Sequence, residues 1–211
     1  MNRSSILNKL FVTLFAPAFI ISMQLPAFAQ TDTGIELYNY WEFKKAEDAF
    51  KKALEDDPGD TKADYYLGLS FLMQKKYSDA LDTLKKIDKT GSPDRGRIKI
   101  ALTRVYLGQK NLPEAMKCLK EAEKAKADPV DIHTFKGAYL LAKGDTEKAV
   151  KELDKAIELK SMNPYTYYHA GFAYLKNGDA KAATKLFEAF LQLAPYAPEA
   201  ANVKFLIDSL C

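Results

Sequence analysis

Cysteine and histidine are scarce in this sequence, and several residue patterns of catalysis are missing. The 211 residues include two cysteines and two histidines. The histidines, His133 and His169, do not form the His-x-x-x-His pair of zinc enzymes. A nucleotide-binding glycine loop and a serine nucleophile elbow are also lacking. The sequence therefore predicts a protein without enzymatic activity, metal or cofactor.

A surplus of charge of one sign is lacking too. The chain has 31 Lys and Arg residues against 28 Asp and Glu residues. Residues 1–29 contain two of the basic residues and no acidic one, so the remainder is close to neutral. Nucleic-acid binders usually carry a strongly basic surface. We therefore expect no nucleic-acid partner.

The N-terminal residues resemble an export signal. Arg3 and Lys9 are followed by an uncharged, mostly apolar stretch, residues 10–25, and then by the small-x-small pattern of Ala27 to Ala29. This order is typical of a secretory signal peptide. We expect cleavage after Ala29 and a periplasmic or secreted mature protein.

A retained membrane anchor is the alternative for this segment. Its apolar run is broken by Pro17 and Pro26 and is shorter than the ~20 residues of a spanning helix. A lipoprotein would need a cysteine directly after the run, whereas the only cysteines are Cys118 and Cys211. We therefore expect no membrane insertion after cleavage.

The rest of the chain shows an internal repeat of about 34 residues. Alanines recur at 34- or 35-residue intervals, at Ala46, Ala80, Ala115, Ala149 and Ala183. A small residue lies twelve positions earlier at Gly34, Gly68, Gly137 and Gly171, and the third repeat has Thr103 instead. Apolar side chains follow each alanine by four, at Phe50, Leu84, Leu119, Leu153 and Phe187. Further members of the same face follow by seven, at Ala53, Ile87, Ala122, Ala156 and Phe190. Spacings of four and seven indicate one face of a helix.

This pattern resembles the tetratricopeptide repeat (TPR) family. The small residue at repeat position 8, the alanine at position 20 and the aromatic or leucine residue at position 24 carry the resemblance across residues 30–196. It implies an all-α fold, a right-handed α-solenoid of five helical hairpins followed by a C-terminal capping helix. The expected division is a signal peptide at 1–29, repeats at 30–60, 61–95, 96–129, 130–163 and 164–196, and the capping helix at 197–211.

Within each repeat we expect the small residue at position 8 to face the alanine at position 20. We expect Gly144 and Gly178 to adopt positive φ in the turns between paired helices, with Asp145 and Asp179 capping the next helix. The capping helix is predicted to turn one apolar face to the last repeat, comprising Ala200, Val203, Phe205, Leu206 and Leu210.

The resemblance also implies a binding groove. In this family the first helices line the concave face, and positions 2, 5, 9 and 12 point into it. From these positions we select seven candidate partner-binding residues: Lys62, Tyr65, Arg97, Arg104, Tyr165, Tyr168 and Phe172. The family's clamp for a terminal carboxylate, built from Lys and Asn side chains, does not occur in any three successive repeats, so chaperone tails are not expected as ligands.

Regular apolar positions favour packing over binding. Leu72, Leu107, Leu141 and Leu175 recur at position 12, and we interpret them as core between repeats. The less regular aromatic and arginine residues are open to either role, although Tyr and Arg are enriched at binding hot spots.

Together these features predict an exported scaffold or adaptor that binds a protein or peptide segment, in cell-envelope assembly. The alternative is a periplasmic small-ligand or glycan-binding module that uses the aromatic end of the groove. Cys118 and Cys211 lie two repeats apart, too far for an internal disulfide. A homodimer crosslinked through Cys211 is a further hypothesis.

Overall fold

The computed structural model describes residues 27–89 and 94–210, and within these residues it contains eleven α-helices and no strands. The helices are α1 (Ala27–Asn39), α2 (Phe43–Asp56), α3 (Thr61–Met73), α4 (Tyr77–Asp88), α5 (Arg95–Gly108), α6 (Leu112–Lys124), α7 (Pro129–Lys143), α8 (Thr146–Glu158), α9 (Pro164–Lys176), α10 (Ala180–Leu193) and α11 (Ala200–Leu210). Residues 1–26 and Cys211 lie outside the described ranges, so the signal peptide and the Cys211 crosslink stay predictions.

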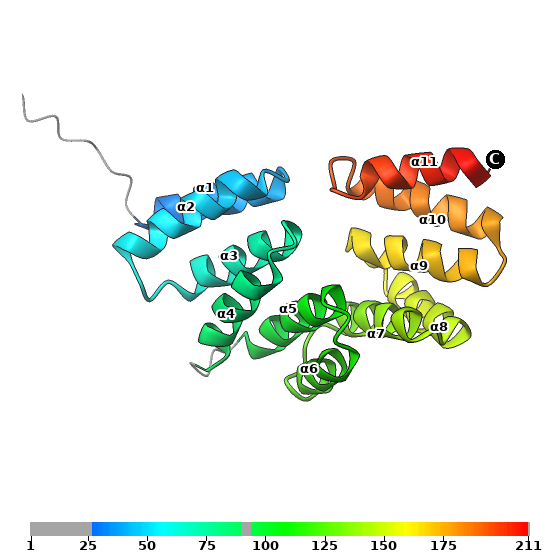
Figure 1. Ribbon diagram of the computed structural model, residues 1–211, viewed down its shortest axis with the longest axis horizontal. Coiled ribbons are helices and arrows are strands. Elements are labelled where there is room, and N and C mark those ends of the chain that lie inside the picture. Colours follow the sequence, from blue (N-terminus) through cyan, green and yellow to red (C-terminus); the bar gives the residue numbers. More distant parts are fainter. Residues whose placement is uncertain (1–26, 90–93, 211) are drawn as a thin grey trace, which may run out of the picture.

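The first ten helices pair into five hairpins that stack into a curved α-solenoid (Figure 1). Each hairpin packs on the next, and each first helix also contacts the first helix of the following hairpin, from α1 to α9. The first helices therefore form a continuous inner layer. The predicted all-α solenoid with a C-terminal capping helix is confirmed.

Helix α1 begins at Ala27, before the expected cleavage point after Ala29. The residue that would start the mature chain, Gln30, is buried, and its side-chain amide donates a hydrogen bond to Asp56, at 2.9 Å. The hydroxyl of Thr31 donates another to Asp60, at 2.7 Å. A chain cut after Ala29 would thus keep the contacts that hold α1 against the end of α2 and the start of α3.

The five alanines of the repeat ladder form the centre of the hairpins. Each has no exposed surface, and the residue four positions later is also almost completely buried, between 0% and 1% exposed. Small residues at these points let the paired helices approach closely, so that their larger neighbours fill the space around them. This is the packing that the spacing of four predicted.

The position-8 glycines lie directly against the large side chain at position 24. A Cβ added to Gly34, Gly68, Gly137 or Gly171 would lie 2.4–2.7 Å from the nearest atom of the side chain at position 24, which is Phe50, Leu84, Leu153 or Phe187. The large side chain at position 24 crosses over the glycine, so it is this side chain that excludes a Cβ. The approach of these glycines to the position-20 alanines stays a prediction.

The turns inside the hairpins all use a left-handed residue at the same repeat position. Gly144 and Gly178 have φ of +93° and +87°, as predicted, but the equivalent residues elsewhere are Trp41, Lys75 and Lys110, with φ near +60°. Asp179 caps α10 by accepting a hydrogen bond from the backbone N–H of Ala182, at 2.9 Å. Asp145 makes no such cap, because its carboxylate lies against the ammonium of Lys143, at 3.2 Å.

The capping helix covers the last hairpin with only part of its predicted apolar face. Ala200 and Val203 are buried and belong to one cluster with Phe187 and Phe190, and Leu206 packs against it. Phe205 is 77% exposed, which contradicts its assignment to the buried face. A spacing of two from Val203 places Phe205 on the far side of the helix.

The two ends of the solenoid approach each other. In Figure 1 the turn after α1 faces the loop before α11 across the opening of the arc. Trp41, in that turn, packs against the cluster formed by α10, α11 and their connection, and its ring also contacts Phe43 edge-on, at 5.7 Å. The arc is therefore closed by one half-buried indole. No helix in the described ranges has the length and apolar character needed to cross a bilayer.

Candidate functional site: the concave cavity

The inner layer encloses a cavity of about 490 Å³. Helices α3, α5, α7 and α9 line it with their side chains, together with the turn after α3, Tyr77 at the start of α4, and Glu199 just before α11. This volume falls within the usual range for ligand pockets, ~300–1,000 Å³.

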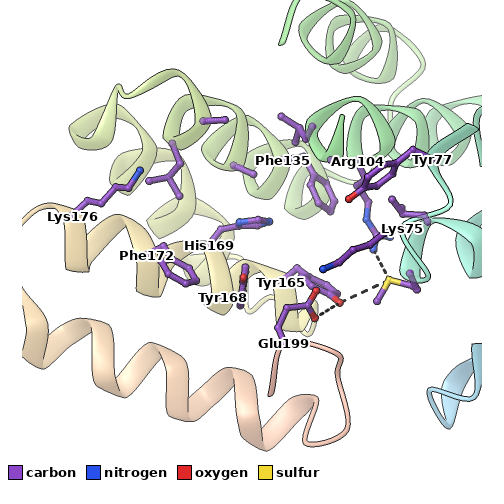
Figure 2. A pocket seen from close by; sticks show the side chains of 17 residues that line it. Lys75, Tyr77, Arg104, Phe135, Tyr165, Tyr168, His169, Phe172, Lys176 and Glu199 are labelled. Atoms are coloured by element: carbon purple, nitrogen blue, oxygen red, sulfur yellow. Dashed lines mark hydrogen bonds between the residues drawn. The ribbon is translucent and has the colours of Figure 1, made fainter. Parts of the chain in front are cut away.

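Helix α9 supplies the aromatic wall. Asn163 accepts a hydrogen bond from the backbone N–H of Tyr165, at 3.0 Å, and Pro164 fixes the first turn, so the helix starts at a defined residue. From there Tyr165, Tyr168 and Phe172 follow at spacings of three and four on one face. All three line the cavity (Figure 2).

The aromatic rings of this wall contact one another and the core behind them. The Tyr165 and Tyr168 centroids are 6.0 Å apart, and those of Tyr168 and Phe172 are 5.0 Å apart. Behind them, Phe190 lies 5.3 Å from Tyr168, and Phe187 lies 5.0 Å from Phe172. These edge-on and tilted contacts hold the rings in place. The wall is therefore a partly buried extension of the hydrophobic core.

Arg104, from α5, extends across the cavity toward this wall. Its guanidinium carbon lies 5.5 Å from the ring centroids of both Phe135 and Tyr165, and one of its N–H groups is directed at the Met73 sulfur, at 3.5 Å. Cation–π contacts of this kind orient the guanidinium without neutralising it. A positive charge is thus held inside an apolar cavity.

Tyr165 also connects distant parts of the chain. Its hydroxyl donates a hydrogen bond to Glu199, at 3.1 Å, and lies 3.8 Å from the Met73 sulfur. Burial and the neighbouring Glu199 carboxylate both raise the pKa of Tyr165. Tyr165 therefore stays protonated at neutral pH and joins the second, third and fifth hairpins with the loop before α11.

His169 lies between Phe135 and the two tyrosines, with its ring 5.4 Å from that of Tyr168. Burial lowers the pKa of His169 to about 4, and the nearby Arg104 charge acts in the same direction. The imidazole is consequently neutral at pH 7 and adds a flat, weakly polar surface to the wall.

The structure divides the seven predicted binding residues between two places. Arg104, Tyr165, Tyr168 and Phe172 line the large cavity. The other three, Lys62, Tyr65 and Arg97, line a separate hollow of about 60 Å³ between α3 and α5.

The three predicted residues at the smaller hollow contact other side chains of the protein. The Arg97 guanidinium lies 4.9 Å from the Tyr65 ring centroid, and Lys62 forms an ion pair with Asp32, at 3.1 Å. Whether any of the seven residues binds a partner stays a prediction.

The position-12 leucines have a double role. Leu72 and Leu141 are buried and belong to two hydrophobic clusters, as predicted. Leu107 is partly buried and packs against the cluster that contains Leu72. The same three side chains also form part of the cavity surface. A leucine at position 12 can therefore pack against the core and line the cavity at the same time.

Several cavity residues escaped the sequence reasoning. Phe135 and His169 occupy position 6, and Met73 and Lys176 occupy position 13. Position 6 lies four residues after groove position 2, and position 13 lies four residues after groove position 9. The helical spacing of four could have revealed them. Lys75, Tyr77 and Glu199 lie outside the first helices, and no local pattern indicates that they lie at the cavity.

Comparisons with known proteins agree with this architecture. Models described as tetratricopeptide repeat match residues 34–95, 71–139 and 164–196, and a model described as TPR repeat matches residues 137–178. A TPR repeat-containing protein of Methanocaldococcus jannaschii is 35% identical over 57 residues. That match covers 27% of this chain and only 10% of the longer relative.

Solved structures show the same fold. TTC0263, a TPR protein of Thermus thermophilus, has a TM-score of 0.72 and 22% identity, covering 87% of this chain and 98% of that one. YrrB, described as a TPR protein with an unusual peptide-binding site, has a TM-score of 0.50 and 20% identity, covering 84% of this chain and 91% of that one. The matched models, the stacked hairpins and the repeat ladder agree: the chain belongs to the tetratricopeptide repeat family.

Proposed function

We propose that this chain is an exported scaffold that holds a segment of a partner protein in its concave cavity, in the assembly of the cell envelope. The fold supports an interaction role, since TPR solenoids present extended concave surfaces. The resemblance of residues 3–29 to a signal peptide supports export. The proposed role is binding, with no chemical step.

One observation carries the binding proposal: five aromatic side chains and an arginine meet in a single open cavity. Large apolar surfaces that stay accessible in a folded protein usually mark binding sites. Aromatic and Arg residues are also the types that contribute most to the energy of protein interfaces. The peptide-binding site named for YrrB, a protein of similar fold, gives further support.

The proposal is tested by placing a large side chain in the cavity. Truncation of Tyr168 or Phe172 is avoided, because these residues also pack against the core. Ala142 is exposed and lines the cavity near the end of α7, whereas the adjacent Lys143 is exposed and does not line it. Ala142→Trp should abolish capture of the partner, and Lys143→Trp should leave capture intact. Circular dichroism should show equal helix content in both variants.

The partner can be identified by placing a photo-crosslinking amino acid at residue 142 in cells of the source organism, with residue 143 as the control. Mass spectrometry should find a protein crosslinked from residue 142 only. Unchanged capture by Ala142→Trp would contradict the proposal. Crosslinks to sugar in place of protein would favour the glycan-binding alternative.

A further inference from the structure

The cavity has a strong imbalance of charge. Three cationic side chains line it, Lys75, Arg104 and Lys176, against a single carboxylate, Glu199. The Glu199 carboxylate already accepts the hydrogen bond from Tyr165. Within residues 27–89 and 94–210, the ion pairs do not include Lys75 or Lys176. The two lysines at the cavity therefore have no acidic partner in the part of the chain that the structure describes.

These two ammonium groups lie at opposite ends of the aromatic wall. Lys75 follows Met73, whose sulfur touches the Tyr165 hydroxyl at the start of α9, and Lys176 is the last residue of α9. Figure 2 shows the row from Tyr165 to Phe172 between them. From Tyr165 to Lys176 the helix rises by about 17 Å, at ~1.5 Å per residue.

We infer that the occupant of this cavity is an extended segment in which an aromatic residue lies between two acidic residues about five positions apart; this rests on the proposed function. The aromatic side chain packs on Tyr168 and Phe172, beside Arg104. The two carboxylates pair with Lys75 and Lys176. At ~3.3 Å per residue, five residues of extended chain match the ~17 Å along α9 from Tyr165 to Lys176.

The size of the cavity favours an extended segment over a helix. A helix with its side chains is ~10 Å wide, and a length of ~17 Å would occupy on the order of 1,300 Å³. The cavity holds about 490 Å³. An extended chain can place one large side chain inside the cavity and leave its backbone at the opening.

Lys75 and Lys176 also have a structural role, which an experiment must separate from peptide binding. Basic residues near a helix C-terminus interact favourably with the helix dipole, and both lysines lie near such ends. Lys110 and Lys160 are exposed lysines two residues after the ends of α5 and α8, and they do not line the cavity. They share the structural role only, and are therefore the matched controls.

The experiment selects binders from a random dodecapeptide library displayed on phage, presented to the mature protein. Enriched peptides should contain an aromatic residue flanked by Asp or Glu about five positions apart. The Lys75→Glu, Lys176→Glu double variant should instead enrich Lys or Arg at the flanking positions. The control double variant Lys110→Glu, Lys160→Glu has the same net charge and should enrich the same peptides as the wild type.

The affinity of one enriched peptide, end-blocked and fluorescein-labelled, should fall roughly tenfold for each cavity lysine reversed, since a repulsive contact replaces an attractive one. Retention of acidic peptides by the Lys75→Glu, Lys176→Glu variant, or failure to enrich any peptide, would overturn the inference. If the enriched peptides carried their acidic residues about eleven positions apart, the spacing of a helix ~17 Å long, the inferred extended conformation would be wrong.

Failure of this inference is distinguishable from failure of the proposed function. If Ala142→Trp blocks capture of the native partner while the library shows no preference for acids, the cavity binds a partner of other chemistry. If Ala142→Trp has no effect on capture, the cavity itself is not the site.

Discussion

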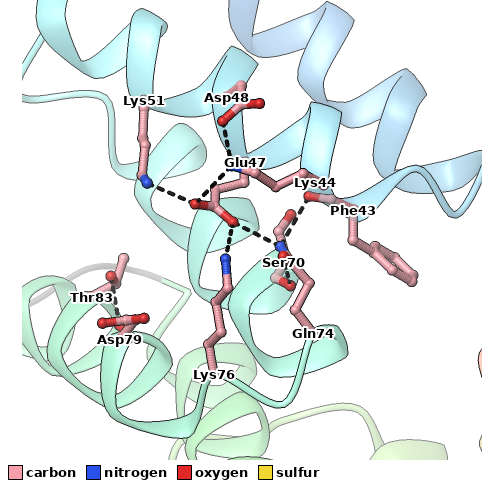
Figure 3. Close-up of polar contacts among 10 residues, drawn as sticks. All are labelled: Phe43, Lys44, Glu47, Asp48, Lys51, Ser70, Gln74, Lys76, Asp79 and Thr83. Carbon is pink, nitrogen blue, oxygen red and sulfur yellow. Dashed lines mark hydrogen bonds and ion pairs between the residues drawn. The ribbon is translucent and has the colours of Figure 1, made fainter.

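A buried carboxylate on α2, the second helix of the first hairpin, illustrates how single residues join neighbouring repeats. Glu47, whose side chain is 3% exposed, accepts hydrogen bonds from Lys51 and Lys76, each at 2.7 Å, and from Gln74, at 2.9 Å (Figure 3). Burial alone would raise the pKa of Glu47, but these donors outweigh it and lower the pKa to about 2. The contacts from Lys76 and Gln74 connect the first repeat to the second.

Glu47→Gln should therefore lower the free energy of unfolding at pH 7 by about 2–3 kcal/mol. Because the pKa in the folded protein is below the unfolded value of ~4.3, the stabilisation is complete above pH ~5 and is lost as the pH falls toward 2. Urea unfolding followed by circular dichroism between pH 7 and pH 3 measures this. Glu55→Gln, an exposed acid of the same helix, should change little; equal losses in both variants would show that Glu47 has no special role.

Backbone strain at Lys110 leads to a second prediction at this scale. Its φ of +58° costs a side-chain-bearing residue ~1 kcal/mol that glycine avoids. Lys110→Gly should therefore raise the melting temperature by a few degrees. Lys120→Gly, in the middle of α6, should lower it, because glycine weakens a helix interior by a similar amount. A Lys110→Gly variant that melts below the wild type would disprove the strain.

At the scale of helices, the contact between positions 8 and 24 determines how closely each pair packs. An alanine at Gly137 would place its Cβ 2.4 Å from the Leu153 side chain. Gly137→Ala should destabilise the protein by about 1–3 kcal/mol through overpacking, and Leu153→Ala by about 2–5 kcal/mol through a cavity. In the double variant the two losses should sum to less than their separate values, since each change relieves the other. Additive losses in chemical unfolding would contradict the contact.

The helices themselves were largely predictable from the sequence, because alanine and its apolar followers recur at helical spacing. The hairpin turns were predictable only at Gly144 and Gly178. Trp41, Lys75 and Lys110 adopt the same conformation without a glycine to indicate it. Each of these turns is closed by a backbone hydrogen bond to the residue five positions earlier, such as the one from the Lys76 N–H to the Phe71 carbonyl, at 2.9 Å. Because any residue type can make such a bond, no side-chain pattern indicates the turn.

The site was half predictable for a related reason. Arg104, Tyr165, Tyr168 and Phe172 were found because they lie on one face of successive first helices. Lys62, Tyr65 and Arg97 lie on the same type of face, yet the curvature of the solenoid places them in a separate hollow. The position of Glu199 depends on how the whole arc curves, which local spacing does not specify.

At the scale of the molecule, the contact of Trp41 joins the first hairpin to the last. Solenoid stability normally arises within repeats and between adjacent ones. Trp41→Ala should nevertheless speed amide hydrogen exchange in α10 and α11, because it removes an apolar contact from their cluster. Tyr40→Ala, its 75% exposed neighbour, should not. Identical exchange in the two variants would show that the ends behave independently.

The contact of Trp41 also provides an intrinsic fluorescence probe. Trp41 is the only tryptophan of the chain, so indole emission reports on one location, the closure of the arc. A ligand that spreads the two ends would move the indole into water and shift its emission to the red. A ligand that fits the closed form would leave the spectrum unchanged.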